Sequence, residues 1–191
     1  KLVGDSYDDA YHASMLECIE LKKTFIHPFD DVKVIEGQAT VGLEILEQAQ
    51  DTIDYVFIPI GGGGLAAGLS TLFRKLSPST KIIGVEPQGA ASMTISIKNN
   101  QNTELPYMDK FVDGAAVKRV GDITFPICKE NLHATITVPE GKVCQTILEL
   151  YNKDAVVVEP AGALSISALD FYAEEIKGKN HIIITEIPYQ V

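Results

Sequence analysis

Short apolar runs alternate with amphipathic stretches along most of this chain. The runs are rich in β-branched residues, which is typical of buried strands, and they lie at residues 24–26, 55–60, 81–85, 135–138, 155–158 and 181–185. Apolar residues at helical spacing predict helices at about residues 5–23, 41–49, 65–76, 122–132, 140–152 and 160–178. Polar, irregular sequence predicts loops at 27–31 and 93–110. Strands separated by helices favour a three-layer α/β fold with a mostly parallel sheet.

The run at 55–60 leads directly into four glycines, Gly61, Gly62, Gly63 and Gly64, which we call the glycine loop. A helix is predicted to follow at Leu65, and the unpaired N–H groups and the dipole of a helix N-terminus favour an anion. Without Cβ atoms the loop can close on phosphate oxygens. The loop has no lysine or arginine, so backbone N–H groups must do the binding. A tight turn for close packing is the alternative, but one glycine would suffice for it.

A dinucleotide site is a second interpretation of the same stretch. Gly61-x-Gly63-x-x-Ala66 matches the dinucleotide fingerprint, and Glu86 follows the next apolar run, about 20 residues on, where an acid that binds ribose is expected. A single match of this kind is a weak signal. From these residues alone, both interpretations stay open.

Four other positions are candidates for chemistry. Asp113-Gly114 can turn the backbone sharply and expose its amides, and Glu159 stands after the predicted strand 155–158, at the end of a sheet where ligands bind. His27, in a loop before proline, is more simply a structural or solvated residue than a ligand or base. Thr40 could equally well line a site or be an ordinary residue in the first turn of a helix.

Composition narrows the classes of partner. The chain has 191 residues, 46% of them hydrophobic, and a formal net charge of −10, which argues against a nucleic-acid partner; Lys118 and Arg119 fit plain surface charges. No apolar run approaches the roughly 20 residues that span a membrane. The three cysteines have no metal-site spacing, which predicts reduced thiols and a cytoplasmic protein. The sequence starts at Lys1 without methionine, so we expect a processed chain or a piece of a longer one.

Seven ordered motifs resemble one family. They occupy residues 2–10, 27–31, 36–44, 60–65, 84–87, 113–118 and 159–163. Together they resemble the later part of threonine dehydratases (threonine deaminases), which are pyridoxal-phosphate enzymes of fold type II with the tryptophan synthase β-like architecture. The resemblance extends from Leu2 to about Asn180 and displaces the dinucleotide interpretation.

The resemblance implies roles for particular residues. The stretch from Gly61 to Leu65, including Gly62, Gly63 and Gly64, would hold the phosphate of pyridoxal phosphate. Asp113, Gly114 and Ala115 would pass near the cofactor ring, and Glu159 would stand near the ring or a structural cation. Relatives that bind a divalent metal use the positions of Glu86, Ala90 and Ser92. The third is usually aspartate, so no divalent metal is expected here.

The resemblance also implies an activity and an organisation. The family eliminates the β-hydroxyl of L-threonine, giving 2-oxobutanoate and ammonia; a serine dehydratase or serine racemase is the first alternative, and a non-catalytic phosphate- or dinucleotide-binding module is the second. The substrate would be an amino acid, and the enzyme a homo-oligomer. Residues 1–35 would belong to the smaller lobe, 36–180 to the main cofactor-binding lobe, and 181–191 to a terminal strand with an atypical tail.

Two departures from the family pattern stand out. The family's Schiff-base lysine lies in an upstream motif that this sequence does not contain, so the chain alone is expected to be inactive. After the last strand, the family's Ser-Gly-Gly-Asn is replaced by residues 185–191, which resemble a segment of the DNA gyrase A subunit and fit either a foreign junction or a chance match. Counting puts Thr185 or Glu186 where a hydroxyl would meet the ring nitrogen. We expect residues 186–191 to pack poorly and to leave the pocket open on that side.

Overall fold

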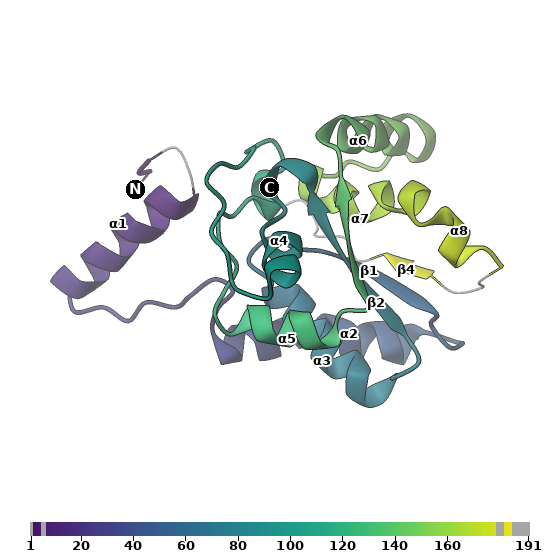
Figure 1. Ribbon diagram of the computed structural model, residues 1–191, viewed down its shortest axis with the longest axis horizontal. Helices are drawn as coiled ribbons and strands as arrows, with labels where there is room; N and C mark the ends of the chain where they lie inside the picture. Colours follow the sequence, from purple (N-terminus) through teal and green to yellow (C-terminus); the bar gives the residue numbers. More distant parts are fainter. Residues whose placement is uncertain (1, 5–6, 179–181, 185–191) are drawn as a thin grey trace.

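The computed structural model describes residues 2–4, 7–178 and 182–184, and all structural statements concern these residues (Figure 1). The α-helices are α1 (Tyr7–Glu20), α2 (Val32–Gln48), α3 (Gly64–Leu76), α4 (Ser92–Asn99), α5 (Thr124–Asn131), α6 (Glu140–Asp154), α7 (Pro160–Ser167) and α8 (Ala173–Ile176). The strands are β1 (Tyr55–Pro59), β2 (Lys81–Pro87), β3 (Ala134–Val138) and β4 (Ile182–Ile184), and the 3-10 turns are η1 (Gln88–Ala90), η2 (Asp113–Ala115) and η3 (Leu169–Phe171).

A parallel sheet in the order β3-β2-β1-β4 forms the middle layer. In Figure 1, α2, α3 and α5 lie on one side of it and α6, α7 and α8 on the other. The predicted three-layer α/β fold is therefore confirmed, as are the strands predicted at 55–60, 81–85 and 135–138. Of the strand predicted at 181–185, the middle three residues pair with β1. His181 and Thr185 lie outside the described residues.

Strand β1 is central because both of its faces are covered. Its five residues are all buried. Val56 and Ile58 face the core shared with α2, α3 and α5, whereas Tyr55 and Phe57 face the core shared with α6 and α7. Successive side chains of a strand point to opposite faces, so an uninterrupted apolar run is what a parallel strand between two helical layers requires. Strand β1 leads through Ile60 into the glycine loop.

The strand predicted at 155–158 is wrong. Ala155 directly follows α6 in the left-handed conformation, with φ 55°, and Glu159 directly precedes α7, so residues 155–159 join two helices that pack together. No described strand pairs with this segment, and Val157 is 67% exposed. A run of β-branched residues supplies strand propensity but cannot supply a neighbouring strand.

The loop predicted at 27–31 is confirmed, whereas one predicted strand, one helix start and most of one predicted loop are wrong. The segment 24–26 has no pairing partner among the described residues. Helix α2 begins at Val32, well before residue 41, because the Asp31 side chain accepts a hydrogen bond from Lys33 N at 2.8 Å and caps it. Helix α4 forms inside the predicted loop 93–110, where buried Met93 gives it an apolar anchor.

The single helix predicted at 160–178 is broken into α7, η3 and α8. The Ser167 hydroxyl donates a hydrogen bond to Ala163 O at 2.8 Å within α7. Bonds of this kind compete with the helix ladder and bend helices. Helix α7 ends at this serine.

A side chain from far away in the sequence caps α5. Asp122, where the sequence predicted this helix to begin, makes no cap and pairs instead with Arg119. The Asp30 carboxylate accepts hydrogen bonds from Asp122 N at 2.9 Å and from Ile123 N at 2.8 Å. Asp30 therefore ties the loop before α2 to the start of α5, which contacts the glycine loop.

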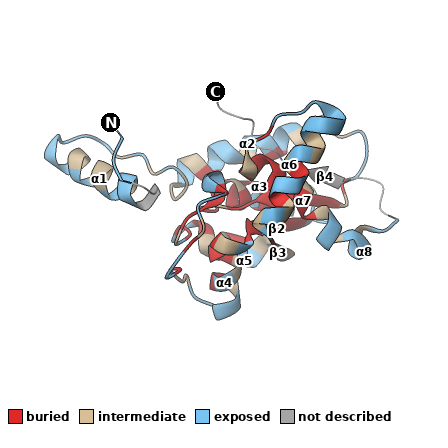
Figure 2. Cartoon of the chain, turned by 90° about the horizontal axis from the view of Figure 1, so that it is seen from above, coloured by how far each residue is buried: buried red, intermediate tan, exposed pale blue. Residues whose placement is uncertain are grey.

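Helix α1 stands apart from the sheet in Figures 1 and 2. Leu16 and Ile19 on it are 70% and 72% exposed. The buried residues are concentrated in the body that contains the sheet, as Figure 2 shows. Helices long and apolar enough to cross a bilayer are absent from the described ranges.

Candidate functional site

The glycine loop connects the buried end of β1 to the first turn of α3. Gly63 is the residue before α3 and has φ +95°, a conformation that side-chain-bearing residues rarely adopt. Gly61 lies against η2: a Cβ there would be 3.2 Å from Ala115 Cα and 3.3 Å from Gly114 O. Glycine is thus required at Gly63 by the backbone angle and favoured at Gly61 by close approach of another segment.

The amide groups of this loop have the arrangement that an anion requires. Gly62, Gly63 and Gly64 are buried. The hydrogen bonds within the described ranges give no acceptor to the N–H groups from Gly61 to Leu65. Buried backbone N–H groups are almost always paired, so successive free donors at the N-terminus of a 13-residue helix fit a phosphate group.

Three segments far apart in the sequence meet at this end of the sheet. Gly61 approaches Gly114, and a Cβ on Gly114 would lie 3.5 Å from both carboxylate oxygens of Glu159 and 2.9 Å from Ala161 Cβ. Asp113 Oδ1 accepts a hydrogen bond from Gly114 N at 3.0 Å. The structure thus brings the glycine loop, Asp113 and Glu159 together at one end of the sheet, although Glu159 follows a connection between two helices and not the predicted strand. Their part in binding stays a prediction.

Glu159 lies between the body of the protein and solvent at the start of α7. Partial burial, and secondly the negative charge of Asp113, raise the pKa of its carboxyl. Two neighbouring carboxyl groups make this side of the site acidic. They favour a positively charged group of a ligand here, opposite the amide donors of the glycine loop.

His27 and Thr40 have local structural roles. His27 Nδ1 accepts hydrogen bonds from Asp30 N at 2.9 Å and from Phe29 N at 3.3 Å, and burial lowers the pKa of the ring. The prediction that this histidine is structural is confirmed. The exposed Thr40 donates its hydroxyl to Gly37 O, three residues back in α2, at 2.7 Å, which supports the ordinary helix residue over a site-lining one.

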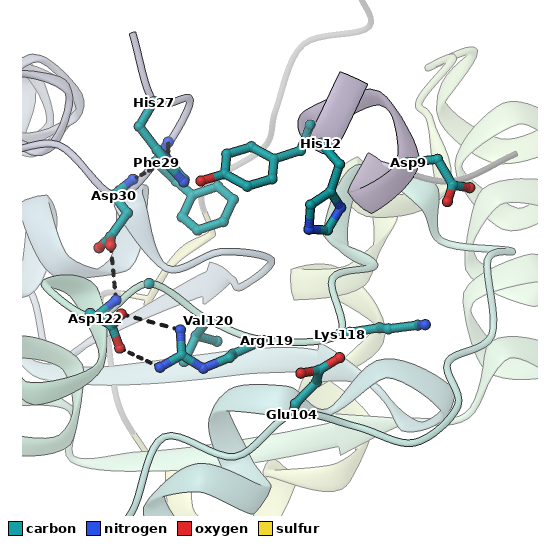
Figure 3. A pocket seen from close by; sticks show the side chains of 12 residues that line it. Asp9, His12, His27, Phe29, Asp30, Glu104, Lys118, Arg119, Val120 and Asp122 are labelled. Carbon is teal, nitrogen blue, oxygen red and sulfur yellow. Dashed lines mark hydrogen bonds and ion pairs between the residues drawn. The ribbon is translucent and has the colours of Figure 1, made fainter. Parts of the chain in front are cut away.

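A cavity of about 430 Å³ opens beside the glycine loop, bounded by α1, the 27–30 loop and residues 104 and 118–122. Figure 3 shows its side chains, including the pair of Arg119 with Asp122. That hydrogen-bonded pair lowers the pKa of Asp122. The ring of Phe29 separates this cavity from the loop, because a Cβ on Gly62 would lie 2.2 Å from Phe29 Cγ. Phe29 was not predicted as a loop contact, and its place in the 27–31 motif was the only signal of it.

Glu86 is fully buried and faces the protein interior. Its two carboxylate oxygens accept hydrogen bonds from Met93 N and Thr94 N, each at 2.7 Å, at the start of α4. Burial, opposed by these hydrogen bonds, raises the pKa of the carboxyl to about 7. Glu86 thus holds α4 on the end of β2 and is not placed to reach the ribose of a dinucleotide.

We expect Glu86→Gln to remove part of the pH dependence of stability. The pKa of Glu86 is about 7 in the folded chain against 4.5 ordinarily, so the folded chain holds this proton more tightly. The resulting stability is fully present below pH 4.5 and is lost as pH rises through 7. The pKa shift corresponds to about 3 kcal/mol in the free energy of unfolding. Urea unfolding at pH 5 and pH 7.5 measures it, with exposed Glu44→Gln as the matched control. Equal pH slopes in Glu86→Gln and the unsubstituted chain would contradict this role.

Comparison with known proteins identifies the family. Residues 1–186 match the family described as pyridoxal-phosphate dependent enzymes. The chain belongs to this family. The pyridoxal-phosphate dependent fold also agrees in structure: the processed form of threonine deaminase isoform 2 from Solanum lycopersicum superposes with a TM-score of 0.91 at 38% identity, covering 100% of this chain and 56% of that one.

Relatives of this pyridoxal-phosphate dependent chain include named dehydratases. A biosynthetic L-threonine dehydratase of Halalkalibacterium halodurans is 53% identical over 183 residues, covering 96% of this chain and 44% of the relative. A serine racemase from Dictyostelium discoideum is 28% identical, with a TM-score of 0.80, over 99% of this chain and 61% of that one. The chain therefore spans less than half the length of the curated relatives it matches.

Proposed function

We propose that this chain forms the phosphate-binding part of a pyridoxal-phosphate dependent threonine dehydratase, which converts L-threonine to 2-oxobutanoate and ammonia. The observation that carries the proposal is the set of amides from Gly61 to Leu65, at the start of α3, from which no described residue accepts a hydrogen bond. The identity to L-threonine dehydratases over nearly the whole chain supports the choice of reaction.

The glycine loop, residues 113–115 and Glu159 would each meet a different part of the cofactor or the substrate. The amides from Gly61 to Leu65 bind the phosphate, with the positive end of the α3 dipole behind them. Asp113, Gly114 and Ala115 would pass near the ring, since a Cβ on Gly61 would lie within 3.3 Å of Gly114 O and Ala115 Cα. The carboxyl of Glu159 adds negative charge on that side and favours a cationic group, such as the ammonium of the amino acid. When bound, pyridoxal phosphate supplies the electron sink for loss of the Cα proton.

Serine is the second candidate substrate. The similarity to a serine racemase, at 28% identity, supports it. Threonine is preferred because the dehydratases are more similar in sequence and cover almost the same residues. A non-catalytic phosphate-binding module is the remaining alternative.

The proposal also covers the lobes of the protein, its cellular compartment and its partners. We place residues 1–35 in the smaller lobe, 36–180 in the main cofactor-binding lobe and 181–191 in the terminal strand and tail. The three free cysteines support a reducing, cytoplasmic compartment. The net charge of −10 opposes a nucleic-acid partner. A homo-oligomer and the absence of a membrane partner stay predictions. The expected arrangement of residues 186–191, and of Thr185 or Glu186 near the ring nitrogen, lies outside the described residues.

Ligand titration tests the first step. We expect the chain to bind pyridoxal phosphate, seen as a change in its absorbance, and inorganic phosphate to compete. NAD should not compete. Tight binding of NAD without binding of pyridoxal phosphate would overturn the proposal in favour of a dinucleotide module.

Complementation tests the reaction. The chain is co-expressed with a polypeptide carrying the portion of the Halalkalibacterium dehydratase that it does not span. We expect the pair to form 2-oxobutanoate from threonine faster than pyruvate from serine. Faster turnover of serine would favour the second candidate, and cofactor binding without turnover of either would favour the non-catalytic module.

A further inference from the structure

Helix α5 lies directly behind the glycine loop and presents two buried polar side chains to it. Thr124 and Cys128 are four residues apart, so they share one face of the helix, and both are fully buried. Each donates to a carbonyl of the loop. The sequence motifs of the family did not point to either residue.

The carbonyl of Gly62 is held by two donors. Thr124 Oγ1 donates to Gly62 O at 2.7 Å, and Gly121 N donates to the same oxygen at 3.2 Å. The alternative acceptor for the hydroxyl, Gly121 O, is 3.4 Å away, so Gly62 O is the better partner. The threonine hydroxyl therefore forms its hydrogen bond with the glycine loop.

The carbonyl of Gly63 is also held. Ala67 N donates to it at 2.8 Å as part of α3, and Cys128 Sγ lies 3.8 Å from it. Burial, and secondly the charge of Glu86, raise the pKa of this thiol, so it keeps its proton and can donate. Two successive carbonyls of the loop thus point toward α5 and α3.

Holding a carbonyl fixes the amide on the other side of the same peptide. The peptide bonds of the described chain contain no cis bond, and in a trans peptide the C=O and N–H groups point in opposite directions. With Gly62 O bonded to Thr124, the N–H of Gly63 points away from α5. No described residue accepts a bond from it.

A peptide between two glycines has the least resistance to turning over, because neither residue has a Cβ that opposes the new angles. We infer that Thr124 is a positioning residue: its hydroxyl holds the Gly62–Gly63 peptide so that the Gly63 N–H faces the phosphate of the ligand. This inference rests on the proposed function. It assigns Thr124 no contact with the ligand itself.

The test compares Thr124→Val, which keeps the shape and loses the hydroxyl, with Thr124→Ser, which keeps the hydroxyl. We expect Thr124→Val to weaken pyridoxal phosphate binding about tenfold or more, as loss of one oriented amide to a charged group implies. Binding of pyridoxal, which has no phosphate, should change less than about twofold by the same reasoning. Thr124→Ser should restore the affinity for pyridoxal phosphate. Thr146→Val is the matched control, because Thr146 is a buried helical threonine in α6.

The outcomes separate this inference from the proposed function. If the unsubstituted chain does not bind pyridoxal phosphate, the proposed function fails. If it binds and Thr124→Val binds equally well, or if Thr124→Val loses both ligands equally, the positioning role is overturned. If a variant does not fold, the inference can still be tested on the unsubstituted chain. There, the amide resonance of Gly63 should shift when inorganic phosphate is added. No shift, in a chain that binds phosphate, overturns the inference.

Discussion

Gly63→Val is expected to lower the affinity for pyridoxal phosphate by more than about 100-fold, equivalent to losing two hydrogen bonds to a charged group. Gly63 has φ +95°, and a Cβ there would lie 2.9 Å from Thr124 Oγ1 and 3.1 Å from Met93 Cε. A β-branched residue cannot keep that angle without strain. The loop must change its backbone, and its amides then no longer converge on one anion.

The matched control for this change is Gly37→Val. Gly37 lies in α2, and a Cβ there would have no neighbouring atom within 4 Å, so the substitution meets open space. Titration of both variants with pyridoxal phosphate, with thermal unfolding recorded alongside, provides the measurement. Binding by Gly63→Val within tenfold of the unsubstituted chain would show that the loop backbone does not hold the phosphate.

Gly68→Ala is expected to destabilise the fold by about 3 kcal/mol, at the upper end of the usual range for overpacking. A Cβ on Gly68 would lie 2.5 Å from Ile35 O and 2.8 Å from Ala39 N, which are backbone atoms of α2. Backbone atoms cannot rotate away as a flexible side chain can. Helices α2 and α3 would have to separate, which opens the core between them and β1.

Gly37→Ala distinguishes this contact from helix propensity. Both glycines are helical, and alanine favours a helix by about 1 kcal/mol over glycine. With free space around it, Gly37→Ala should stabilise slightly, whereas Gly68→Ala should lower the midpoint of urea unfolding. A Gly68→Ala chain as stable as the Gly37→Ala chain would contradict the close packing of α2 on α3.

The elements that could be predicted from the sequence are those that local residues determine. The apolar run 55–60 and the helix after the glycine loop are recognisable because burial on both faces and a continuous helical stripe leave a direct pattern. The run 155–158 has the same pattern of residues, but its structure depends on whether another strand lies beside it. Helix α4 was missed because Glu86, outside it, supplies the carboxylate that binds its first amides.

The residues of the candidate site also differ in whether the sequence alone could reveal them. The four glycines indicate a special turn by themselves, so the loop and its helix could be predicted from the sequence. Thr124 and Cys128 could not be, because a single threonine or cysteine in an amphipathic helix is ordinary until the carbonyl it meets is known. A polar residue on the buried face of α5 was the only available signal.

The contacts of α5 with distant residues determine when the glycine loop can obtain its final shape during synthesis. Thr124 follows Gly62 by 62 residues, and the cap from Asp30 to Ile123 joins residues 93 apart. During synthesis the glycine loop therefore leaves the ribosome well before the helix that orients its carbonyls. Closing such long loops is entropically demanding and slows folding. A nascent chain that ends before α5 holds every glycine of the phosphate site but not yet its shape.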